Sequence, residues 1–153
     1  MLVNYFFLAV ILLISIVAPS IGKSISGSIL ASKYSSSVND FKKSAEYNLN
    51  ILNSGTKESA FYNDALLYLV ASGNFSQAFE LSEEMYELGL RSPVLSLVMI
   101  IEKISNEKLN DSMSLIQLFE KDLPPVLVAS LRGWINLKKG NLVNSLVEFK
   151  KLS

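Results

Sequence analysis

The chain has 153 residues, carries 14 basic and 14 acidic side chains, and contains neither cysteine nor histidine. Its formal neutrality gives no electrostatic footprint for a phosphate backbone, which argues against nucleic-acid binding. The two missing residue types exclude disulfides, thiolate metal sites, a cysteine nucleophile and a histidine base. We therefore assign no catalytic, cofactor-binding or metal-binding residue and expect a protein that is not an enzyme.

Residues 2–18 form an apolar run interrupted only by Asn4 and Ser15, and the run ends before Pro19. An apolar core followed by small residues is typical of a secretory signal peptide, although no basic residue precedes this one. The run is also long enough to span a membrane, which takes about 17–25 residues. Residues 1–22 are therefore expected to be a cleaved signal peptide or a retained membrane anchor, the third alternative being a buried first helix.

Side chains of the same kind return at a nearly constant interval. Large apolar residues occur at spacings of 34, 34 and 33 residues, at Phe41, Phe75, Leu109 and Leu142. A small residue comes three positions after each of them, and another large apolar residue comes seven positions after that. These pairs are Ser44 and Ile51, Ala78 and Met85, Ser112 and Phe119, and Ser145 and Leu152. An internal period of this length indicates a stack of similar units.

Within each period, apolar residues recur every three or four positions, which indicates two helices. Gly89 is expected to end one helix in the left-handed conformation. Ser92 is expected to cap the next, with Pro93 at its first position. No segment alternates with period two, so no sheet is expected. The predicted hairpins pair residues 27–36 with 39–53, 58–72 with 75–88, 93–105 with 109–121, and 125–138 with 142–152.

The small residue of each period is expected where the two helices of a hairpin cross, since a large side chain would push their axes apart. The large residue after it is expected to fill the gap between successive hairpins. No hairpin buries its apolar face alone, so stability should depend on stacking.

The period and its positions resemble the tetratricopeptide repeat, most closely between Tyr62 and Leu90, where Ala65, Leu69, Gly73, Phe75 and Ala78 match the family pattern. The resemblance covers residues 25–152 as repeats 25–58, 59–92, 93–125 and 126–152. It implies an all-α fold: a right-handed superhelical stack of about four helix-turn-helix hairpins after an N-terminal hydrophobic helix. Leu90 stands where the family has proline. The first repeat is rich in serine, so its first helix is expected to fray or be irregular.

The resemblance further implies that the first helix of each hairpin lines a concave groove. The groove residues are then Lys33, Asn63, Leu67, Val70, Leu97, Ile101 and Trp134, with Ile104 and Leu137 beside them. Such a mostly apolar surface suits an extended or helical peptide with apolar anchors. The alternative is that the leucines and isoleucines are core and that Trp134 packs between helices.

The last predicted helix carries Val143 and Val147 beside its main apolar stripe. In an internal hairpin we expect that face to meet the next hairpin, so the two valines are candidates for association with another chain. The alternative is that two exposed valines need no explanation.

The sequence also looks like exported bacterial tetratricopeptide proteins that begin with a signal peptide. The first hypothesis is therefore a non-enzymatic scaffold that binds a protein or peptide partner through its groove, without a cofactor. It would be periplasmic after cleavage, or held in the inner membrane through residues 2–18. The second is a structural or assembly subunit that forms a homo-oligomer or joins a larger complex through its uncapped C-terminal repeat.

Overall fold

The computed structural model describes residues 25–152, and this part of the chain is helical without any strand, which confirms the all-α prediction. The expected signal peptide or hydrophobic helix in residues 1–22 lies outside the described residues. None of the helices within 25–152 is long and apolar enough to cross a membrane. The helices are α2 (Ile25–Ser37), α3 (Phe41–Asn53), α4 (Ser59–Ala71), α5 (Phe75–Glu87), α6 (Pro93–Ser105), α7 (Leu109–Leu118), α8 (Pro125–Lys138) and α9 (Leu142–Lys150).

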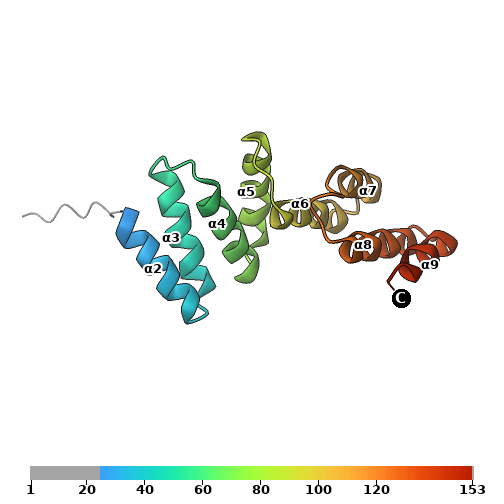
Figure 1. The fold of residues 1–153 in the computed structure, drawn as a ribbon, viewed down its shortest axis with the longest axis horizontal. Coiled ribbons are helices and arrows are strands. Elements are labelled where there is room, and N and C mark those ends of the chain that lie inside the picture. The colour runs from blue at the N-terminus through green and yellow to red at the C-terminus, as the bar shows by residue number, and fades with distance from the viewer. Residues whose placement is uncertain (1–24, 153) are drawn as a thin grey trace, which may run out of the picture.

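Each helix packs against the next one in the chain, and α4 also contacts α6. The helices pair as the hairpins α2–α3, α4–α5, α6–α7 and α8–α9, which stack into an elongated body with α2 at one end and α9 at the other (Figure 1). This is the predicted helical repeat stack. The largest boundary difference is at α7, which ends at Leu118 and not at 121, because the chain turns there toward Pro124 and Pro125.

The turn inside each hairpin has the same backbone conformation. A residue in the left-handed region stands at one repeat position each time: Asn39 (φ 60°), Gly73 (φ 76°), Glu107 (φ 58°) and Gly140 (φ 76°). Next comes the cap of the second helix, and in three hairpins its side chain accepts a hydrogen bond from a backbone N–H of the first turn: Asp40 from Lys43 (3.2 Å), Asn74 from Gln77 (3.5 Å) and Asn141 from Asn144 (3.2 Å). Local sequence thus favours the reversal in these three hairpins, whereas in the third hairpin, α6–α7, Lys108 stands at the cap and makes no side-chain hydrogen bond.

The predicted signals between hairpins are confirmed as well. Gly89 adopts φ 75° just after α5, and Ser92 caps α6 by accepting a hydrogen bond from the Leu95 N–H at 3.2 Å. Pro93 occupies the first turn of that helix, where its missing N–H removes no helical hydrogen bond.

The expectation that the serine-rich first helix is frayed or irregular is wrong. The helix α2 is continuous, and its serines Ser28, Ser32 and Ser35 are buried against α3. The Asn48 Nδ2 group of α3 donates a hydrogen bond to Ser32 Oγ at 2.7 Å, and Ser32 Oγ donates to a backbone carbonyl of α3 at 3.4 Å. Small hydroxyl side chains let the two helices approach closely while their polar atoms stay satisfied.

The repeating core positions are buried as expected. The small residues at the crossing of each hairpin, Ser44, Ala78, Ser112 and Ser145, are 0–2% exposed. The large residues after them are buried in the first three hairpins, at Ile51, Met85 and Phe119, whereas Leu152 in the last hairpin is 40% exposed. Hairpins that have a following neighbour therefore bury this position, which is the packing that a stack requires.

The partly buried contact between Tyr62 and Glu84 gives a pH prediction. The Tyr62 hydroxyl of α4 donates a hydrogen bond to Glu84 Oε1 of α5 at 2.9 Å, and the residue is 6% exposed. Burial, and then the Glu84 carboxylate, raise the pKa of Tyr62 above its ordinary value of 10.0. The resulting stability should be fully present below about pH 10 and be lost as pH rises through the raised pKa. Tyr62→Phe should remove this part of the pH dependence. The urea-unfolding midpoints of the unchanged protein and of Tyr62→Phe would be measured across alkaline pH. The same dependence of the midpoint on pH in the two proteins would contradict this role of Tyr62.

Candidate functional site

An apolar cleft of about 170 Å³ lies between the second and third hairpins. Apolar side chains alone line it: Leu67 and Val70 from α4, Phe75 and Phe79 from α5, and Val94, Leu97, Val98 and Ile101 from α6. Four of the predicted groove residues, Leu67, Val70, Leu97 and Ile101, are therefore brought together in one cleft.

A second cleft, of about 360 Å³, lies between the third and fourth hairpins. Its lining comes from α6, α7 and α8, and comprises Ile104, Leu109, Leu131, Trp134, Ile135, Leu137 and Lys138. Trp134 thus lies in a cleft of the same kind, although not in the same cleft as Leu67 and Ile101. Ile104 and Leu137, which were predicted to lie beside the groove residues, also line this second cleft.

The two clefts are built from the same repeat positions. Val70, Phe75, Val98 and Ile101 of the first cleft correspond to Ile104, Leu109, Leu131 and Trp134 of the second, at separations of 34 or 33 residues. The stacking of hairpins therefore forms an apolar cleft between the second and third hairpins and an equivalent cleft between the third and fourth.

The helix α6 joins the two clefts. Its residues Val94, Leu97 and Ile101 line the first cleft, and Ile104, one turn further along, lines the second. Residues three and four apart share a face of a helix. An apolar strip along one face of α6 therefore runs from one cleft to the other.

Several cleft residues are too exposed to be core alone. Leu67 is 46% exposed, Ile101 is 40% exposed and Trp134 is 63% exposed, while Val70 and Leu97 are half-buried. The Trp134 ring meets the Phe149 ring of α9 edge-on, with ring centroids 5.5 Å apart. Trp134 is therefore both held by a neighbouring helix and open to solvent.

Lys33 and Asn63, also predicted as groove residues, line neither of these clefts. Lys33 is exposed on α2, and Asn63 of α4 is half-buried, with its Oδ1 lacking a hydrogen-bond partner among the described residues. At this first junction Phe41 stacks on Tyr68 of the next hairpin, with ring centroids 6.1 Å apart. Phe41 is the counterpart of Phe75, so an aromatic contact stands where the next junction has an open cleft.

The groove prediction did not include the residues that the second helix of each hairpin contributes to the two clefts. Phe75, Phe79 and Leu109 line them, but the groove was assigned to first helices only. The repeat pattern contained the information needed to include them, since Phe75 and Leu109 occupy the same repeat position. A large apolar residue at the start of a second helix points toward the junction with the next hairpin.

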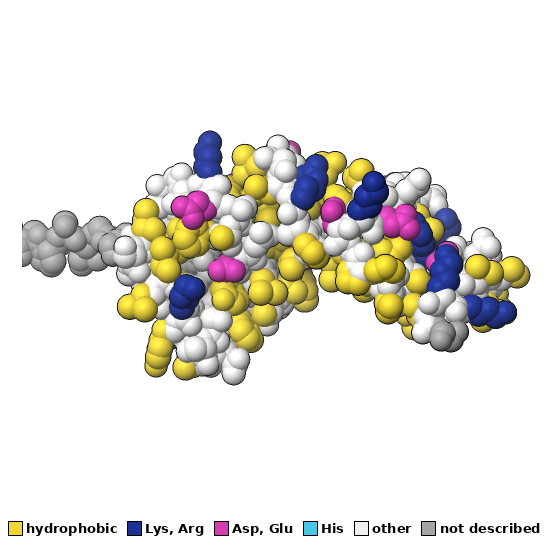
Figure 2. All heavy atoms as spheres, viewed as in Figure 1, with side chains coloured by type: hydrophobic (Ala, Val, Ile, Leu, Met, Phe, Trp, Pro, Cys, Tyr) yellow, Lys and Arg dark blue, Asp and Glu magenta, His cyan; other side chains and the backbone are white. Residues whose placement is uncertain are grey.

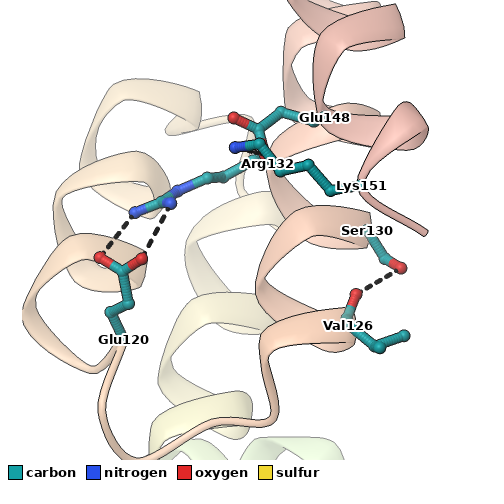
Figure 3. A network of polar contacts seen from close by, with 6 residues as sticks. All are labelled: Glu120, Val126, Ser130, Arg132, Glu148 and Lys151. Atoms are coloured by element: carbon teal, nitrogen blue, oxygen red, sulfur yellow. Dashed lines mark hydrogen bonds and ion pairs between the residues drawn. The ribbon is translucent and has the colours of Figure 1, made fainter. Parts of the chain in front are cut away.

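Charged side chains around the clefts are paired. Lys138, the one charged lining residue, bonds to Glu107 at 3.3 Å. Nearby, Arg132 of α8 binds Glu120 through two hydrogen bonds of 3.1 Å, and Lys151 pairs with Glu148 at 2.8 Å (Figure 3). The Arg132 guanidinium lowers the pKa of Glu120 below its ordinary value. On the face shown in Figure 2, Lys and Arg gather over α8 and α9, and hydrophobic side chains dominate the middle of the stack.

Within residues 25–152, no group of three or more acidic side chains is placed to hold a metal ion. The acids beside α8, Glu120 and Glu148, are each engaged with a cation. Both acids line a further cleft of about 230 Å³ together with Arg132 and Lys151, and the Arg132–Glu120 pair links the fourth hairpin to the segment that follows α7.

The valines of the last helix are exposed, Val143 at 73% and Val147 at 52%. The expectation that an internal hairpin would bury this face is wrong. Their counterparts in the preceding hairpins are all exposed and polar: Lys42 and Glu46, Ser76 and Glu80, Asn110 and Ser114. These positions point to solvent even where another hairpin follows, so the valines are not the surface on which a further hairpin would stack.

No protein-family model matches the chain, and no curated protein is similar to it at a significant level.

Proposed function

We propose that this chain is a non-enzymatic scaffold of the tetratricopeptide type, which binds a protein or peptide partner through the two apolar clefts. The observation that carries the proposal is their repetition: the same positions form a partly exposed cleft at two successive junctions, joined along α6. A partner with two apolar side chains at a matching spacing would fill both.

The chemistry of the clefts favours apolar anchors over charged ones. A contiguous set of exposed apolar side chains is a frequent mark of a protein interaction site. The charge at the rim of the second cleft, Lys138, is already paired with Glu107. Trp134 is the single tryptophan of the chain and belongs to a residue type that often dominates binding energy. The partner segment is therefore expected to be short, amphipathic and poor in charge where it contacts the clefts.

The cellular setting is part of the proposal and rests on the sequence of residues 1–22. An apolar run followed by small residues supports export with cleavage, or retention at the inner membrane. In either setting the groove would act in the bacterial cell envelope. Determining the N-terminal residue of the protein isolated from its host would distinguish the two.

Leu67→Glu and Ile101→Glu test the groove directly. Each places a carboxylate in the apolar first cleft, and we expect each to weaken binding by at least about tenfold, or about 1.4 kcal/mol. Leu88→Glu is the matched control, since Leu88 is 48% exposed, much like Leu67, but lines neither cleft. Chains captured by the full-length protein would be identified, and peptides covering their bound segments would then be titrated against all four proteins.

Trp134 supplies an independent readout because it is the only tryptophan and lies in the second cleft. Filling that cleft with apolar side chains should shift its fluorescence emission to shorter wavelength, and replacing the peptide's apolar anchors by aspartate should abolish the shift. Equal weakening by Leu88→Glu would show that binding does not use the groove. Loss of helical structure in Leu67→Glu and Ile101→Glu would show that these residues are core.

The alternative function, a structural or assembly subunit, is favoured by a different observation. Both ends of the described stack expose large apolar side chains, on α2 at one end and on α9 at the other.

A further inference from the structure

The junctions between hairpins within this chain use a fixed pair of surfaces. The first and fifth residues of a second helix face the next hairpin: Phe41 stacks on Tyr68 at the first junction, and Phe75 and Phe79 line one cleft with Val94 and Val98 at the second. Each junction therefore joins a donating surface on a second helix to an accepting surface on the following first helix.

The donating surface is exposed at the C-terminal end of the stack. Leu142 and Leu146 are the first and fifth residues of α9, and they are 59% and 55% exposed. At the fifth position the counterparts Ala45, Phe79 and Met113 are buried or half-buried. At the first position Phe41 and Leu109 are half-buried, whereas Phe75 is 50% exposed even with a hairpin after it. Apolar side chains of the type used at the internal junctions therefore stand uncovered by the described residues.

The accepting surface is exposed at the other end. Tyr34 of α2 lies 34 residues before Tyr68, the residue on which Phe41 stacks, and it is 68% exposed. Leu30 of α2 is 72% exposed; its counterpart in α4 is the exposed Asp64, and its counterparts in α6 and α8 are Val98 and Leu131. Val98 and Leu131 line the clefts between hairpins.

We propose that copies of this chain associate head to tail, with Leu142 and Leu146 of one copy packing on Leu30 and Tyr34 of the next. The occupant of each end is a second copy because one chain carries both halves of a junction that it already forms internally. A formal net charge of zero allows copies to approach without overall repulsion. Because the two surfaces differ, the contact is heterologous: each dimer keeps one free surface of each kind, so further copies can add as a ring or as an open chain. This inference is independent of the proposed peptide binding.

The absence of cysteine from the whole sequence makes the proposal testable by cross-linking. Full-length Tyr34→Cys and Leu142→Cys proteins, solubilised in detergent, would be treated with a short bismaleimide separately and as a mixture. The mixture is expected to give a cross-linked dimer that either protein alone does not give. Both positions are exposed, so neither change disturbs the core. Ser76→Cys, an exposed position on α5 away from both ends, serves as the control partner for each.

Second-site changes then test which face of α9 makes the contact. Leu146→Glu in the Leu142→Cys protein is expected to lower the cross-linked yield at least tenfold, whereas Val143→Glu in that protein should leave it nearly unchanged. Circular dichroism would establish that each variant keeps its helices. No cross-link in the mixture, equal yield with Ser76→Cys, dimers of Leu142→Cys alone, or a larger loss from Val143→Glu than from Leu146→Glu would each overturn the proposal.

Discussion

Replacing Phe119 with alanine is expected to lower the free energy of unfolding by about 3–5 kcal/mol. Its side chain is 1% exposed, and its ring meets the Tyr86 ring edge-on, with centroids 6.0 Å apart. Tyr86 belongs to the second hairpin and Phe119 to the third, so this pair fills the junction at the middle of the stack. Alanine would leave a cavity there that the surrounding helices can fill only in part.

The loss of the Phe119 ring should also change how the protein unfolds. In a repeat stack each hairpin is stabilised mainly by its neighbours, so a weakened central junction lets the two halves unfold separately. Urea unfolding followed by circular dichroism should therefore show an earlier and broader transition in Phe119→Ala. Leu118→Ala is the matched control, because Leu118 is adjacent but 58% exposed, and it should change stability by no more than about 0.5 kcal/mol. Equal losses in the two variants would contradict this role of Phe119.

The fold could be predicted from sequence because its signals are local and repeated. Asn74 and Asn141 cap helices next to glycines in the left-handed conformation, and both pairs stand at the same repeat position. Because the period occurs four times, a weak match in one repeat is compensated by stronger matches in the others. The helix α2 was misjudged because its serines were read by composition alone, whereas Asn48 and the close approach of α3 satisfy them.

The candidate site was predicted only in part, for a geometric reason. The repeat pattern identifies which residues share a position, and it therefore found Leu67, Ile101 and Trp134. It does not state which neighbouring helix covers each position, and that depends on how hairpins stack. For this reason the contribution of Phe75 to a cleft, and the outward direction of Val143, became evident only from the packed helices.

The second large effect is expected from Ala78→Leu, which tests the crossing of two helices inside a hairpin. Ala78 of α5 is 0% exposed, and its counterparts Ser44 and Ser112 are equally buried, so a small residue fills this position in each of the three hairpins. A leucine would force α4 and α5 apart or drive side chains out of their preferred rotamers, with a loss of about 1–3 kcal/mol.

The same substitution at Ala60 provides the control, because Ala60 lies in the first turn of α4 and is exposed. Ala60→Leu adds the same volume to the same kind of element without a neighbour to displace, and it should change stability by less than about 0.5 kcal/mol. Thermal unfolding of both variants would measure the difference. The small side chain is required by the repeat only if Ala78→Leu unfolds well below Ala60→Leu. Matching transitions would show that the spacing of the two helices is set elsewhere, and that the recurrence of small residues at this position has another cause.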